Sequence, residues 1–452
     1  MKRSIDYYLS NWRQRSNRKP LILRGARQVG KTHAVYRLGR QFDNFVEVNF
    51  ELYPSAKSIF DIDLSPTRIV RDLSLLTQQM IVPGKTLLFL DEAQEQPKVL
   101  LALRYFYEKM PELHVIAAGS LLDFAIEKVG VPVGRVEFLN MYPMSFIEFL
   151  WATNNQLIAK AILSQPVTTP LTQTIHDKII RLLSEYLATG GMPEVVQVWC
   201  DTEELGKVLI AQQNIVNGYI QDIPKYARKS QVEHVDVVFK HIPYILGQRF
   251  KASNIAGEYR KRELAPAIDL LEKSMIAHRI YHTSAQGLPL AAQSDLEKYK
   301  LILVDIAIAQ KLLNSDPREW ILNPKEACIN KGPLIEAFVG QEIVAYQDPR
   351  SPSELFYWHR EERGSSAEVD YIITHNRDIV PIEVKSDRGS NLKSMRSFLE
   401  SHPNSNYGVR FSNHNYSVID DLHSYPLYAV SALFQQNHAA LYALDSEPVE
   451  VS

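Results

Sequence analysis

Unbroken apolar runs alternate with amphipathic stretches along the first 150 residues. A strand that is buried on both faces is apolar throughout, whereas an amphipathic helix repeats its apolar residues about every three to four positions. The predicted strands are residues 21–24, 45–50, 86–92, 114–120 and 134–139. The predicted helices are residues 4–17, 33–40 and 68–80. Strands that alternate with helices predict an α/β fold with a parallel sheet and helices on both of its faces.

Helical patterns dominate the chain after residue 150. Residues 157–219 are predicted to form helices, interrupted by a rigid turn at the Gly-Gly-Met-Pro sequence of residues 190–193. A short helix, a longer helix at 263–273 and a strand at 276–282 then follow one another. This order predicts a winged-helix-like unit, a fold that binds DNA or protein. The longer helix is acidic rather than basic, which favours an interaction role over base reading in a DNA groove.

The last part of the chain returns to a mixed pattern. A loop is predicted at 316–331 and a helix after it, and the predicted strands are 355–358, 368–373 and 379–385. A chain of 452 residues is too long for one ordinary core, and about three domains are expected. We predict an ATPase-like domain at 1–150, a helical and winged-helix-like domain at 151–315, and a third α/β domain at 316–452.

The loop after the first predicted strand carries the most specific motif. Residues 25–32 read Gly-Ala-Arg-Gln-Val-Gly-Lys-Thr and match G-x-x-x-x-G-K-[ST] without a mismatch. A strand before this pattern and a helix after it are the context that a phosphate-binding P-loop requires. The backbone N–H groups and the helix N-terminus attract phosphate oxygens. The predicted ATP-binding residues are Gly25, Ala26, Arg27, Gln28, Val29, Gly30, Lys31, Thr32 and, further along the chain, Asp91. Lys31 is expected to meet the β- and γ-phosphates, and Thr32 is expected to bind Mg²⁺.

Acidic residues end the third predicted strand. Its apolar run leads into Asp91 and Glu92, a Walker B pattern at the strand edge where open α/β sheets bind ligands. Asp91 is expected to hold Mg²⁺ with Thr32, and Glu92 is expected to polarise the attacking water. Ser120 ends the next strand and fits a γ-phosphate sensor, although Gly-Ser is also ordinary turn chemistry. Arg135 remains open as an arginine sensor, a subunit-interface residue or a plain surface residue.

A second constellation lies near the C-terminus. Asp370 is on one predicted strand, and Glu383 and Lys385 are on the next, so the order matches the PD-(D/E)xK pattern of restriction-endonuclease-like folds. Residues i and i+2 of a strand share a face, which brings Glu383 and Lys385 together. Two carboxylates that hold Mg²⁺, with a lysine that activates water, can hydrolyse a phosphodiester. Glu336 on the preceding helix completes the candidate site, and an acidic and basic hairpin without catalysis is the alternative.

Composition limits the other classes of function. The formal net charge of −2 gives no global attraction to nucleic acid. Cys200 and Cys328 are far apart and in no metal-binding pattern, so buried, reduced thiols are expected. No apolar run approaches the ~18 residues of a membrane span. We therefore expect a cytoplasmic protein without a membrane partner.

Together these motifs resemble a family of prokaryotic AAA-type ATPases that carry a conserved, uncharacterised domain after the ATPase. The resemblance covers nearly the whole chain. It rests on residues 24–32, 89–94, 119–120, 134–135, 142–146, 190–194, 369–371 and 382–385. It implies ATP binding at an AAA-like parallel sheet, a winged-helix-like middle and a nuclease-like end, with no known substrate. The chain departs from the pattern at Ala118, where threonine is expected before Gly119-Ser120.

Three functions follow from this reading. The first is an ATP-driven switch or motor whose C-terminal domain engages DNA or RNA, and the second is a nuclease gated by ATP. The third is an adaptor that binds protein partners and uses ATP hydrolysis as a slow timer. The triad Asp370, Glu383 and Lys385 favours the second, and the neutral charge and the acidic helix favour the third. The sequence leaves oligomerisation open.

Overall fold

The computed structural model describes all residues except 131, 133, 256, 363–364, 386–391 and 438–452. Five strands form the first sheet in the order β2–β3–β4–β1–β5, and each pairs with its neighbours in parallel. Their bounds are β1 (Leu21–Arg24), β2 (Asn44–Asn49), β3 (Thr86–Asp91), β4 (His114–Ala118) and β5 (Glu137–Asn140). Every residue of β3 and β4 is buried, as the unbroken apolar runs predicted.

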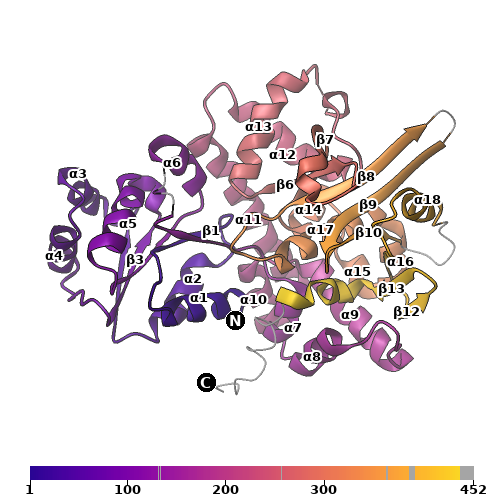
Figure 1. Cartoon of the computed structure of the whole chain (residues 1–452), viewed down its shortest axis with the longest axis horizontal. Coiled ribbons are helices and arrows are strands. Elements are labelled where there is room, and N and C mark those ends of the chain that lie inside the picture. Colours follow the sequence, from indigo (N-terminus) through magenta and orange to yellow (C-terminus); the bar gives the residue numbers. More distant parts are fainter. Residues whose placement is uncertain (131, 133, 256, 363–364, 386–391, 438–452) are drawn as a thin grey trace.

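Helices cover both faces of this sheet, as expected. Helices α1 (Ile5–Gln14) and α2 (Lys31–Gly39) pack on the face that Leu21 and Leu23 of β1 share. Helices α4 (Pro66–Thr77) and α5 (Lys98–Lys109) pack on the opposite face, with Ile22 of β1. Shorter elements complete this lobe: η1 (Pro54–Ser58), α3 (Ile59–Ile62), η2 (Ala93–Glu95) and α6 (Leu122–Val129). Figure 1 shows this lobe on one side of the molecule and the rest of the chain on the other.

The middle of the chain is helical up to residue 273. It contains α7 (Phe146–Ala152), α8 (Gln156–Ser164), α9 (Gln173–Thr189), α10 (Pro193–Thr202), α11 (Leu205–Tyr226), α12 (Val232–His241), η3 (Ile242–Ile245), η4 (Ala252–Asn254) and α13 (Lys261–Lys273). Ser145 and Glu148 form the predicted capping box at the start of α7. Strands β6 (Ala277–Thr283) and β7 (Ser294–Leu303) then form an antiparallel hairpin, with η5 (Leu290–Gln293) between them.

A second sheet unites this hairpin with the C-terminal strands. Its eight strands lie in the order β12–β13–β11–β10–β9–β8–β6–β7. The further strands are β8 (Leu355–Glu362), β9 (Ser365–His375), β10 (Asp378–Val384), β11 (Gly408–Ser412), β12 (Ser417–Ile419) and β13 (Leu422–Pro426). Because β6 pairs in parallel with β8, the sheet continues across the boundary that we predicted at residue 315. The predicted end of the last domain lies outside the described residues.

Our prediction of a loop at 316–331 is wrong. This segment forms α15 (Arg318–Leu322) and α16 (Pro324–Asn330) after α14 (Ile306–Leu312). Proline precedes α15 and opens α16, which suits the first turn of a helix but ends a longer one. The fully buried Trp320 anchors the short α15. Helices α17 (Gly332–Tyr346) and α18 (Lys393–Ser401) and the 3₁₀ segment η6 (Leu427–Asn437) are the remaining elements of the described residues.

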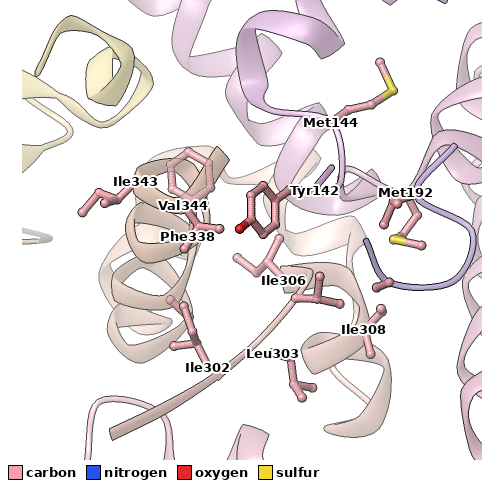
Figure 2. Packing of buried hydrophobic residues seen from close by; sticks show 14 of the residues in the cluster. Tyr142, Met144, Met192, Ile302, Leu303, Ile306, Ile308, Phe338, Ile343 and Val344 are labelled. Carbon is pink, nitrogen blue, oxygen red and sulfur yellow. The ribbon is translucent and has the colours of Figure 1, made fainter. Parts of the chain in front are cut away.

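One hydrophobic core joins the two lobes. It runs from α1 and β1 through the middle helices to α17, β9 and η6. Figure 2 shows Tyr142 between Phe338 and Val344 of α17 on one side and Met192 on the other. Among the described residues, no helix is long and apolar enough to cross a membrane.

Candidate functional site

Glycine allows the P-loop to curl between β1 and α2. Gly25 has φ 155° and Gly30 has φ 98°, which is the region of positive φ that side chains disfavour. A Cβ on Gly25 would lie 2.3 Å from the carbonyl oxygen of Met141. Helix α2 begins at Lys31, so its N-terminus follows the loop directly. The backbone therefore has the shape that cradles a phosphate.

Lys31 folds back over the loop. Its Nζ donates hydrogen bonds to the carbonyl oxygens of Gly25, at 2.8 Å, and Ala26, at 2.9 Å. Burial lowers the pKa of Lys31 to about 8, although the nearby Glu92 and Asp91 charges favour its protonated form. A buried ammonium that is held only by carbonyls gains strongly from an anion placed beside it.

The P-loop and the Walker B strand meet at one hydrogen bond. Thr32 Oγ1 donates to Asp91 Oδ2 at 3.2 Å, which brings together the two predicted Mg²⁺ ligands. Asn49, at the end of β2, also reaches this carboxylate, with Nδ2 3.4 Å from Oδ2. Burial raises the pKa of Asp91 to about 6, and the neighbouring Glu92 adds to the shift. Asn49 was not predicted from the sequence. Its only signal there is its position at the end of the strand before the Walker B strand.

Glu92 occupies a constrained turn directly after β3. Its φ of 51° is left-handed, and its backbone N–H donates to Asp91 Oδ1 at 3.0 Å. Gln94 Nε2 donates to Glu92 Oε2 at 2.5 Å and so holds the carboxylate. Gln94 also packs on Gly119, where a Cβ would lie 2.0 Å from Gln94 Oε1. The turn therefore touches the end of β4 immediately before Ser120, whose sensor role stays a prediction.

Arg135 lies at the wrong end of the sheet to sense a nucleotide bound by its own chain. It precedes β5, whose first residue pairs with Leu21 at the start of β1, whereas the P-loop follows the end of β1. Its Nε contacts Glu108 Oε1 of α5 at 3.0 Å. The phosphate-sensor role within one chain is therefore wrong. A role at a subunit interface stays a prediction.

The middle helices support the P-loop from outside the first lobe. Arg27 forms an ion pair with Asp222 of α11, and Tyr219 Oη donates to the carbonyl oxygen of Arg27 at 2.9 Å. Pro193, at the start of α10, lies 3.5 Å from where a Cβ of Gly30 would be. The predicted glycine turn thus packs directly against the phosphate-binding loop.

ATP and Mg²⁺ fit these residues. Gly25 leaves no room for a side chain, and the Lys31 ammonium is buried against the loop carbonyls. The Thr32 hydroxyl and the Asp91 carboxylate lie within hydrogen-bond distance of each other. Oxygen ligands of this kind suit Mg²⁺, which binds few protein groups and keeps phosphate oxygens and water as its other ligands.

The C-terminal candidates gather where α17 meets the second sheet. Lys300 Nζ of β7 contacts Glu336 Oε1 at 3.0 Å and Glu368 Oε1 at 2.5 Å. Asp370 Oδ2 accepts a hydrogen bond from the backbone N–H of Val384 at 2.7 Å. The last paired residues of β9 and β10 are Tyr371 and Ile382, so Asp370 and Glu383 come next on the two strands.

Electrostatics link these groups. Burial raises the pKa of Glu336 to about 7, and the Asp370 charge adds to the shift while Lys300 opposes it. Burial likewise raises the pKa of Asp370 and of Glu383, and Lys385 opposes both shifts. Lys385 Nζ lies 3.5 Å from Glu383 Oε2. The four predicted residues therefore act on one another, with Asp370 between the α17 side and the β10 side.

Two features of this cluster bear on a metal. No three Asp, Glu, His or Cys side chains in the described part of the chain lie where they could share a metal ion. Asp370 and Glu383 are thus a pair of carboxylates at most. Lys300, which was not predicted from the sequence, is fully buried. Its ammonium compensates the charges of the Glu336 and Glu368 carboxylates. The signal in the sequence was a lysine directly before the apolar run of residues 301–304.

The acidic charges of α13 have partners within the chain. Arg279 of β6 forms ion pairs with Asp269 and Glu272, and Lys273 forms one with Glu127 of α6. Two acidic residues of this helix are thus neutralised by an arginine of the adjacent strand β6.

Comparison with known protein families assigns three segments. Residues 17–150 match the model of the AAA domain. This segment is a P-loop ATPase domain of the AAA type. Residues 180–319 and 331–430 match two models described as domains of unknown function, DUF8612 and DUF4143. The second and third models thus assign no chemistry to the rest of the chain.

Comparisons with individual proteins add little. No curated protein matches the chain. Among solved structures, the Walker-type ATPase PABY2304 of Pyrococcus abyssi matches at 16% identity and a TM-score of 0.44, over 69% of this chain and 95% of that one. AMPPCP-bound DnaA from Aquifex aeolicus matches at 12% identity and a TM-score of 0.26, over 60% and 86%. PCH-2 of C. elegans matches at 13% identity and a TM-score of 0.27, over 44% and 62%. These scores are too low to support an argument about this chain.

Proposed function

We propose that the chain binds and hydrolyses ATP at the junction of the P-loop and β3. The hydrogen bond between Thr32 and Asp91 carries the proposal, because it joins the Walker A hydroxyl and the Walker B carboxylate at one point. The match of residues 17–150 to the AAA domain model supports it independently.

Each residue has a role that follows from its position. Lys31 leaves the loop carbonyls to meet the β- and γ-phosphates, whose charge keeps it protonated. Thr32 and Asp91 would hold Mg²⁺, which neutralises phosphate charge when bound. Glu92 orients and polarises the attacking water when it is released from Gln94. Gln94 therefore holds the base in place until the substrate arrives.

Two substitutions test this proposal. Lys31→Ala is expected to abolish nucleotide binding, since it removes the charge that meets the phosphates. Glu92→Gln is expected to bind ATP with nearly unchanged affinity and to hydrolyse it at least ~100-fold more slowly. Exposed Lys207→Ala on α11 serves as the control for lysine removal. Hydrolysis by Glu92→Gln at the parent rate would show that another residue activates the water.

A second candidate function is cleavage of nucleic acid at the C-terminal cluster. Glu383 supports it, because this buried carboxylate lies beside both the Lys385 ammonium, 3.5 Å from its Oε2, and the Asp370 charge. Two buried carboxylates close to one another are costly unless positive charge compensates them. Arg410 of β11 is the register partner of Glu383 of β10, and it adds a positive group suited to binding a phosphate. In this function Asp370 and Glu383 would hold a divalent cation, which would supply an activated water within reach of Lys385.

Cleavage of single- and double-stranded DNA and RNA with Mg²⁺ or Mn²⁺, with and without ATP, tests this second function. Lys385→Ala is expected to abolish cleavage and to leave the ATPase rate unchanged. Lys298→Ala, an exposed lysine of the same sheet, is the matched control. Cleavage that survives Lys385→Ala would come from a contaminant. Absence of cleavage and of nucleic-acid binding in the parent would instead favour the adaptor that binds protein partners.

A further inference from the structure

Arg3 is a buried cation directly behind the P-loop. Only 7% of its surface is exposed. Its Nη1 donates to the carbonyl oxygen of Val29 in the loop at 3.0 Å, and its Nη2 donates to that of Tyr142 at 2.7 Å. Its Nε forms an ion pair with Glu148 Oε2 at 3.1 Å. One planar guanidinium thus joins the phosphate-binding loop, the end of the first lobe and α7.

Glu148 continues this connection into α7. Its Oε2 accepts the backbone N–H of Ser145 at 3.0 Å, and its Oε1 accepts the N–H of Ser4 at 2.6 Å. The next backbone N–H of α7, from Phe146, donates to Glu342 on α17, at 3.0 Å to Oε1. Two buried carboxylates therefore hold the N-terminus of α7, one from its own first turn and one from α17.

Helix α17 also reaches the C-terminal cluster. Glu336 on this helix contacts Lys300, and its carbonyl oxygen accepts a hydrogen bond from Tyr371 Oη at 2.8 Å. Tyr371 is next to Asp370 on β9. The helix that contacts α7 through Glu342 thus contacts the cluster through Glu336. Close packing makes it difficult for one end of such a helix to move alone.

We infer that Arg3 is a positioning residue for the nucleotide site and couples P-loop occupancy to the environment of Glu336 through α7 and α17. The inference rests on the proposed ATP binding. Nucleotide binding draws Lys31 and the loop backbone toward the phosphates. Because Arg3 holds the carbonyl of Val29, the same movement acts on Glu148 and the start of α7. A residue that only stabilised the fold would leave α17 insensitive to nucleotide.

Full-length Arg3→Ala and Arg3→Lys test this inference, with Arg15→Ala as a control that removes an exposed arginine just after α1. Nucleotide affinity, the KM and kcat for ATP, and hydrogen exchange of α17 with and without a non-hydrolysable ATP analogue are measured below each variant's melting temperature. In the parent and in Arg15→Ala, the analogue is expected to slow exchange in α17. In Arg3→Ala, affinity is expected to fall about tenfold, KM to rise more than kcat falls, and the exchange response to disappear.

Arg3→Lys keeps the buried charge but cannot donate in a fork to both carbonyls, so we expect it to fold and to show an intermediate affinity with a weakened exchange response. If Arg3→Ala does not fold, the affinity and exchange response of Arg3→Lys test the inference alone. Parent-like affinity and exchange in either variant would overturn the inference and leave the ATPase proposal standing. A parent that binds no nucleotide would instead overturn the proposed function and this inference together.

Discussion

At the scale of single residues, several buried ionisable groups of this chain lie where its parts meet. Arg3 and Glu148 join the P-loop to α7, and Glu342 joins α7 to α17. Asp305 caps α14 and also accepts the backbone N–H of Gly191 at 2.6 Å. Burying an ionisable group is costly unless the group is paired or hydrogen-bonded. These contacts therefore restrict how the parts of the chain can be arranged relative to one another.

Glu342 gives a prediction about pH. Burial raises the pKa of this carboxyl to about 8, from 4.5 for an ordinary glutamate. The folded state therefore keeps a proton that the unfolded chain loses as the pH rises above about 4.5. The burial of this carboxyl does not lower the free energy of unfolding at pH 4, and it lowers it increasingly up to about pH 8. Glu342→Gln keeps an oxygen for the N–H of Phe146 and removes the ionisation.

Relative to Glu342→Gln, the parent is therefore expected to lose stability between pH 5 and pH 9, by up to a few kcal/mol. Urea unfolding at both pH values measures this difference, with the exposed Glu326→Gln as the control. An equal difference between parent and Glu342→Gln at pH 5 and pH 9 would show that the carboxyl is already ionised at low pH.

At the scale of elements, local pattern predicts what local physics determines. The unbroken apolar runs predicted β1, β3 and β4, and the P-loop motif predicted the turn between β1 and α2, since glycine geometry there is a property of the local chain. Pairing partners were not predictable in this way. The hairpin β6–β7 has the helix-then-strand order of a winged helix, yet it joins the C-terminal sheet through β8, far along the chain.

The residues of the candidate sites show the same difference between local patterns and long-range contacts. Thr32 and Asp91 are joined by a hydrogen bond, because parallel strands end at the same sheet edge. Lys300 and Arg3 carry no motif, and only the folded chain shows what they contact. Arg135 shows the converse, since its place before a strand left a sensor role open and the strand direction puts it at the far edge.

At the scale of the whole molecule, the parts that we predicted as separate domains share one core. Figure 2 shows residues from the end of the first lobe, from the glycine turn, from α14 and from α17 packed together. Asn140, at the end of β5, donates its backbone N–H to the carbonyl oxygen of Pro349 at 2.7 Å. The ATPase lobe is thus attached to the segment between α17 and β8 by a hydrogen bond, and to the rest of the chain by shared packing.

The glycine turn at residues 190–193 is where a small change should disturb all parts at once. Gly191 donates to Asp305, and its carbonyl oxygen accepts the N–H of Met144 at 2.6 Å. A Cβ on Gly191 would lie 2.2 Å from the carbonyl oxygen of Met144, which is backbone and cannot turn aside. Gly206, in α11, would have no atom within 4 Å of an added Cβ.

Gly191→Ala is therefore expected to cost about 2–4 kcal/mol of unfolding free energy and to weaken ATP binding, because Pro193 follows two residues later against Gly30 of the P-loop. Gly206→Ala is expected to be neutral or to stabilise by up to ~1 kcal/mol, since alanine favours a helix over glycine. Denaturant unfolding and nucleotide titration of both variants measure these effects. If Gly191→Ala matched Gly206→Ala in both measurements, the close contact at Met144 would not hold the lobes together, and the shared core would have to maintain their arrangement without it.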